Sequence, residues 1–160
     1  PLTQGDAACV SAMAYNEYWQ VLNEGLKPEE LTVFRYEDEG VATLEDGLYV
    51  HGDNLKDAAF KDKMVRFVRA SMKGWKYAET NQAEAAEIVV NNDDSGAQTV
   101  DHNTTQMGEI AKLTAGSNGS LSEADFNRTV DSLMTGGSDP VITKMPVGAW
   151  SHAITDVALN

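Results

Sequence analysis

Short apolar runs in the amino-terminal third of the chain are spaced like β-strands. Residues 6–13, 31–35 and 47–51 form three such runs, and glycine or proline residues lie close to them. Connections of helix or loop length separate the runs, where a hairpin would need only a two-residue turn. The pattern therefore predicts three strands joined by crossover connections.

A helical period replaces this pattern from about residue 53 onward. One apolar stripe follows the spacing i, i+4, i+7, i+8, i+12 and i+15, and it consists of Phe60, Met64, Phe67, Val68, Met72 and Trp75. It predicts a long helix from Asp53 or Asn54 to about Asn81, with the stripe facing a core. Shorter helices are predicted at 16–24, 83–90, 101–114, 122–136 and 150–159, with Gly25 ending the first of these.

Composition narrows the class of protein. The 160 residues carry 12 Lys and Arg against 25 Asp and Glu, a formal charge of −13. The basic residues are scattered among acidic ones, so nucleic-acid binding is not expected. The length suits one domain, and no apolar run is long enough to span a bilayer.

Familiar catalytic motifs are missing from the sequence. The three histidines have no metal-binding spacing, and no glycine-rich phosphate loop or nucleophile elbow is present. Cys9, the single cysteine, lies in an apolar run and is expected to be a buried, inert thiol. Asn103, Asn118 and Asn127 begin glycosylation sequons, a match that is frequent by chance. We expect neither a metal nor a cofactor.

One junction is chemically unusual. Tyr15, Asn16 and Glu17 place an aromatic ring, a carboxamide and a carboxylate between the first predicted strand and the helix after it. Ligands of open α/β sheets bind beyond the carboxyl ends of strands, where such groups can stack on a ring and hydrogen-bond its edge. Alternatively, the aromatic residues belong to a core and Asn16 is only a helix N-cap.

Several segments together resemble a known family. Residues 1–19 (PLTQGDAACVSAMAYNEYW), 35–50, 65–78, 113–117 and 136–155 are similar, in order and spacing, to the carboxy-terminal half of an ABC-transporter solute-binding protein. The type is the one that resembles the pyrimidine synthases of thiamine biosynthesis. It includes receptors for nitrate, sulfonate, taurine, riboflavin and the thiamine pyrimidine.

This resemblance implies an α/β fold of the type II periplasmic-binding kind, present here as a helix-rich partial chain. Residues 1–40 would be the tail of the second lobe with the hinge crossing, and residues 41–160 the carboxy-terminal part of the first lobe. The implied partners are a small-molecule solute, an ABC permease in the membrane and a missing amino-terminal half. The implied location is periplasmic or extracellular.

The resemblance also places the ligand site. Family pocket residues follow the strand that would end at Met13, which implies Tyr15, Asn16 and Glu17, with Tyr36 and Asp38 near the crossing as weaker candidates. An acid-rich pocket edge disfavours an anion, so the expected solute is neutral or cationic and ring-bearing, like the thiamine pyrimidine. The alternatives are a pyrimidine-synthase-like enzyme, which Cys9 alone does not support, and an inactive truncated fragment.

Overall fold

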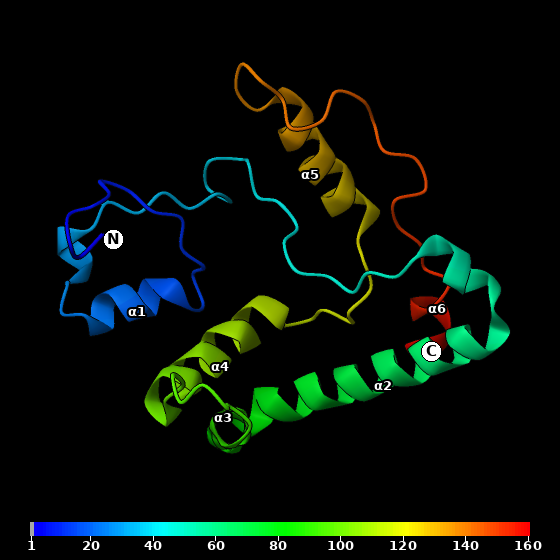
Figure 1. Ribbon diagram of the computed structural model, residues 1–160, viewed down its shortest axis with the longest axis horizontal. Helices are drawn as coiled ribbons and strands as arrows, with labels where there is room; N and C mark the ends of the chain where they lie inside the picture. The colour runs from blue at the N-terminus through cyan, green and yellow to red at the C-terminus, as the bar shows by residue number, and fades with distance from the viewer. Residues whose placement is uncertain (1) are drawn as a thin grey trace. The chain divides into compact units, whose positions relative to one another are not determined.

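The structure is a computed structural model that describes residues 2–160, and Pro1 lies outside the described residues. The chain is built from helices and extended connections (Figure 1). In chain order the helices are α1 (Glu17–Asn23), a 3₁₀ turn η1 (Pro28–Glu30), a second 3₁₀ turn η2 (Gly52–Lys56), α2 (Ala58–Thr80), α3 (Gln82–Asn91), α4 (Val100–Thr114), α5 (Glu123–Thr135) and α6 (Thr155–Ala158).

Local sequence signals account for several of these helix boundaries. The Ser122 hydroxyl accepts a hydrogen bond from the Asp125 N–H and so caps the beginning of α5. Gly25 follows α1 with φ +102°, a conformation that glycine adopts without the steric penalty of a side chain. The long helix starts later than predicted. Residues 52–56 form η2 first, and the Asp57 carboxylate then accepts the Ala59 N–H.

The three predicted strands are wrong for this structure. Residues 6–13, 31–35 and 47–51 are extended or bent, and no strand occurs anywhere in residues 2–160. A strand exists only where a second strand satisfies its peptide groups, and a short apolar run does not specify that partner. Phe34 is 71% exposed and Tyr49 81% exposed, as expected for extended segments without a sheet around them.

The fold class therefore needs a correction. The described residues are helical and irregular, so the α/β layering implied by the resemblance is absent from them, although the prediction of a helix-rich chain is confirmed. Two compact units are present. The first comprises the described residues up to Thr32 together with Lys73–Ser117, and the second comprises Val33–Met72 and Asn118–Asn160. The lobe boundary near residue 40 stays a prediction.

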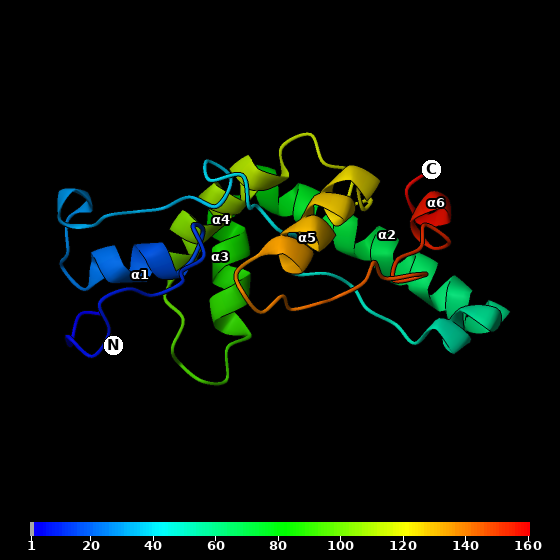
Figure 2. The ribbon, with the colours of Figure 1, turned by 90° about the horizontal axis from the view of Figure 1, so that it is seen from above.

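The core of the first unit lies between α3 and α4, which run side by side in Figures 1 and 2. Ala86 is completely buried and Ala85 nearly so, and their small side chains let the two helices approach closely. Asn103 of α4 is 1% exposed, and its amide donates to the Gln98 side chain (2.8 Å) and the Thr99 carbonyl (3.0 Å). This sequon asparagine is therefore not accessible to a glycosylating enzyme in the folded chain.

Polar contacts join the end of α2 to these two helices. The Tyr77 hydroxyl donates to the Glu84 carboxylate of α3 at 2.6 Å, a bond that raises the pKa of the phenol. On the other side, the Thr114 hydroxyl of α4 bonds the Glu79 carboxylate at 3.2 Å. These contacts fix the position of the α3–α4 pair relative to the last turns of α2.

In the second unit, the carboxy-terminal segment that contains α6 lies against α5 and α2. Val130 and Ala158 are buried, and α6 lies beside the beginning of α2 in both views (Figure 2). The Arg69 guanidinium donates to the Val157 (3.0 Å) and Ala158 (3.2 Å) carbonyls. A positive charge there also suits the negative end of α6.

Two expectations about burial need correcting. The apolar stripe of α2 is only partly covered: Phe60, Met64, Val68 and Met72 are half-buried, whereas Phe67 is 54% exposed and Trp75 is also exposed. Cys9 was expected inside and is exposed, because the extended segment around it packs against no second layer. Among residues 2–160, no helix combines the length and the apolar character that a membrane crossing requires.

Enlarging Ala86 should destabilise the first unit. Ala86→Leu places a larger side chain where α3 and α4 already touch, so we expect the free energy of unfolding to fall by about 1–3 kcal/mol. Urea denaturation followed by circular dichroism measures this change. Ala83→Leu, at an exposed site of the same helix, should stay within about 0.5 kcal/mol of the parent. Equal effects of the two substitutions would contradict a tight α3–α4 contact.

The loop between α3 and α4 should be sensitive to acid. The Asp93 carboxylate accepts hydrogen bonds from the Ser95 hydroxyl (2.6 Å) and from the Ser95 and Gln98 N–H groups, which hold its pKa below the ordinary value of 3.8. The stabilisation is complete above the unfolded pKa and is lost as pH falls through the lower folded pKa.

NMR titration of the Ser95 and Gln98 amide signals tests this prediction. Both signals should move together below about pH 4, as expected for protonation of a carboxylate. Asp93→Asn should abolish the common transition, and Asp94→Asn, at the adjacent acidic residue, should leave it in place. A transition that survives in Asp93→Asn would assign the effect to another group.

Candidate functional site

Asn16 occupies the N-cap position of α1 but does not cap the helix. Its side chain accepts no backbone N–H of α1. Instead its Oδ1 lies 2.8 Å from His102 Nε2 of α4 and 3.1 Å from the Gln20 amide nitrogen. Asn16 therefore holds the N-cap position that the alternative gave it, but its carboxamide also links two helices of the first unit.

Glu17 lies against the same carboxamide. Its Oε2 accepts the Met13 N–H at 2.9 Å, and its Oε1 is 3.4 Å from Asn16 Nδ2. Both contacts use donors close in sequence, and no cation is paired with this carboxylate among the residues described. Asn16 and Glu17 thus place an amide donor and a carboxylate acceptor beside each other.

The aromatic residues around this pair are half-buried rather than part of a core. Tyr15 directly precedes Asn16, and Trp19 donates its indole N–H to the Ala14 carbonyl at 3.1 Å. Tyr18 meets Trp19 edge to face, with ring centroids 5.7 Å apart. The rings are therefore available in part to solvent, which a stacking role requires and a core role does not.

His102 is the residue that sequence reasoning missed. It lies 86 positions from Asn16, so no local spacing connects the two. Its Nδ1 is buried and has no hydrogen-bond partner among residues 2–160. A histidine in the first turn of a predicted helix was a visible signal, but only the packing of α1 against α4 shows which residue it contacts.

Tyr36 and Asp38 belong to the second unit. Both lie in a tight turn in which the Val41 N–H donates to the Tyr36 carbonyl and the Gly40 N–H to the Glu37 carbonyl. This pattern is a Schellman motif, and Gly40 supplies its positive φ of 74°. The Tyr36 ring is half-exposed, at the start of the turn.

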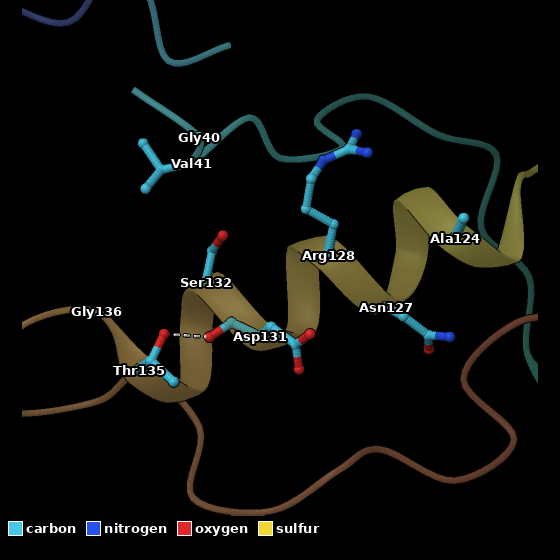
Figure 3. A pocket seen from close by; sticks show the side chains of 9 residues that line it. All are labelled: Gly40, Val41, Ala124, Asn127, Arg128, Asp131, Ser132, Thr135 and Gly136. Carbon is cyan, nitrogen blue, oxygen red and sulfur yellow. Dashed lines mark hydrogen bonds between the residues drawn. The ribbon is translucent and has the colours of Figure 1, made fainter. Parts of the chain in front are cut away.

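An open groove of about 580 Å³ follows this turn in the second unit. Figure 3 shows Arg128 and Ser132 of α5 rising toward the chain at Gly40 and Val41, while Asn127 points to the other side. The remaining lining residues are Ala124, Asp131, Thr135 and Gly136. Arg128 is already engaged, since it donates to the Ala42 carbonyl at 3.0 Å and to Asp125 at 2.6 Å.

Comparison with known proteins identifies the family. Residues 1–85 match the family described as NMT1/THI5 like, which is more than half of the chain. The chain belongs to this family, which confirms the family that the sequence resembles. No curated protein matches the chain, and no solved structure matches it. The matched range contains all five predicted site residues, whereas His102 lies outside it.

Among the residues described, no group of three or more histidine, cysteine, aspartate and glutamate side chains could hold a metal ion. The Asn16–Glu17–His102 cluster is instead suited to hydrogen bonding with a small polar molecule.

Thr129 should control the order of the segment next to the groove. Its hydroxyl accepts the Leu44 N–H at 2.8 Å and donates to the Asp125 carbonyl. Thr129→Val keeps the shape and removes the acceptor. Amide hydrogen exchange at Leu44 should then accelerate by about fivefold, the effect of one ordinary hydrogen bond. Thr135→Val, whose hydroxyl bonds only its own helix, is the control and should leave Leu44 unchanged.

Proposed function

We propose that this chain is part of the solute-binding component of an ABC import system. Membership of the NMT1/THI5 like family supports a solute-binding role working with a membrane permease. The single structural observation that carries the proposal is the Asn16–Glu17 pair. It places donor and acceptor groups together, within the matched range and beside the half-buried Tyr15 ring.

The proposed solute is a small, neutral or cationic, heteroaromatic molecule of the thiamine-pyrimidine kind. The Tyr15 face can stack on a planar ring, and Glu17 can accept hydrogen bonds from an amino group. The formal charge of −13 and the Glu17 carboxylate, with which no cation pairs among the described residues, both disfavour an anion such as nitrate. Tyr36 and Asp38 are proposed as further contacts from the segment that crosses between two lobes.

We further propose that the receptor contains an amino-terminal half in addition to this chain and works in the periplasm or outside the cell. The irregular segment from Val33 to Val50 supports the first part. It exposes several large apolar side chains, among them Phe34, Leu48 and Tyr49, which a covering half of the receptor would bury. Closure of the two lobes would then bury the solute, and the permease would recognise the closed form.

Binding without catalysis is the proposed activity. The alternative is a pyrimidine-synthase-like enzyme, which would need a pyridoxal-type group bound to the protein. Absorbance of the purified protein near about 400 nm, where an imine of that cofactor absorbs, would favour the enzyme. We expect no such band.

Calorimetry with the aminopyrimidine of thiamine tests the site. Glu17→Ala should weaken binding by about tenfold to one-hundredfold because it removes a charge-assisted hydrogen bond, and Tyr15→Ala by about fivefold because it removes a stacking face. Glu24→Ala at the exposed end of α1 and Tyr49→Ala are the matched controls and should bind like the parent.

The result also separates the proposals from one another. Unchanged affinity in both Tyr15→Ala and Glu17→Ala would reject the site while leaving the receptor role standing. Tight binding of nitrate in place of the aminopyrimidine would reject the proposed solute class. Absence of binding by any of these solutes would favour the inactive fragment.

A further inference from the structure

His102 faces the oxygen of the Asn16 carboxamide, and this contact determines which group of the carboxamide is left for a ligand. We propose that His102 is a positioning residue that selects the hydrogen-bonding edge of the solute, an inference that rests on the proposed function. It adds a residue from α4, outside the matched range, to the Tyr15–Asn16–Glu17 junction that the sequence predicted at the start of α1.

Three contacts assign the orientation of the carboxamide. Oδ1 has two neighbours that can donate, His102 Nε2 at 2.8 Å and the Gln20 amide nitrogen at 3.1 Å. Nδ2 faces a carboxylate, Glu17 Oε1 at 3.4 Å, which can only accept. A rotated carboxamide would set its oxygen against the Glu17 carboxylate, so the network favours the orientation described.

The same network assigns the tautomer of His102. Because Nε2 faces an acceptor, the ring proton of neutral His102 belongs on Nε2, and Nδ1 is then a bare acceptor. The buried Nδ1 has no partner among residues 2–160, and the structure tolerates an unpaired acceptor more readily than an unpaired N–H. His102 therefore donates to Asn16 and holds its oxygen away from the ligand.

This orientation has a consequence for the solute. Asn16 presents an N–H donor, and Glu17 presents an acceptor. A flat molecule that bonds both must carry an acceptor next to a donor on one edge, as a primary carboxamide or an aminoazine does. A rotated Asn16 would present a second acceptor and would favour an edge with two donors, as in an amidinium cation. His102 thus selects a neutral acceptor–donor edge.

Two probes that differ in one non-hydrogen atom test the selection. Benzamide carries an acceptor and a donor, whereas benzamidinium carries two donors on the same ring. Comparing the ratio of their dissociation constants between the parent and a variant cancels the general attraction of the acidic chain for a cation. His102→Phe keeps an aromatic ring but loses the donor, so the ratio should shift toward benzamidinium by about fivefold.

Controls distinguish donation from a merely structural role. His102→Gln keeps an N–H donor and should restore most of the parental ratio, and His51→Phe, at an exposed histidine of the second unit, should leave it unchanged. Circular dichroism must show that each variant keeps the parental helix content. An unchanged ratio in folded His102→Phe would overturn the proposal.

Nitrogen NMR of the histidine rings tests the positioning without any ligand. Long-range ¹H–¹⁵N spectra of the parent chain should show His102 as the Nε2–H tautomer when neutral, and an Nδ1–H tautomer would overturn the assignment. If neither probe binds the parent or its variants, the proposed function fails at this site, while the tautomer still decides whether His102 orients Asn16.

Discussion

Hydrogen bonds from side chains to backbone groups far away in the sequence hold much of this chain together. The buried apolar residues of the described chain are few and small, so they bury little apolar surface: Ala85, Ala86, Val130 and Ala158. Long-range hydrogen bonds supply the missing constraints. Arg69 donates to the Val157 and Ala158 carbonyls, Arg128 to the Ala42 carbonyl and His152 to the Leu121 carbonyl. Each bond satisfies a peptide group of an extended or terminal segment, which a larger hydrophobic core or a sheet would otherwise have to position.

The candidate site also depends on a hydrogen bond between residues far apart in the sequence, here between two side chains. Asn16 belongs to a short helix with no buried residue, so local packing alone does not orient its side chain. The His102 ring on α4 provides the orientation, and α4 is in turn held by its contact with the small residues of α3. A chemical feature recognised within the family-matched range is therefore completed by a helix outside that range.

Helix prediction succeeded where local physics is sufficient. The capping serine of α5, the glycine after α1 and the polar break between α3 and α4 each act over a few residues, and the corresponding helices are present. Strand prediction was wrong because an apolar run is also compatible with an exposed, extended chain. The predicted burial of the apolar stripe of α2 was only partly confirmed, for a related reason. Its period establishes a helix, but the extent of its burial depends on which elements cover it, and nothing covers Phe67 fully.

The sequence by itself determined the family, most of the helix positions and the choice of Tyr15, Asn16 and Glu17 as candidates, because these follow from local spacing and from residue types at a junction. Tertiary structure alone decided that Asn16 contacts His102, that Asn103 is buried and that Cys9 is exposed. The reason is physical. Spacing along the chain specifies a helix through bonds three or four residues apart, whereas the partner of a side chain 86 residues away is set only when two helices pack.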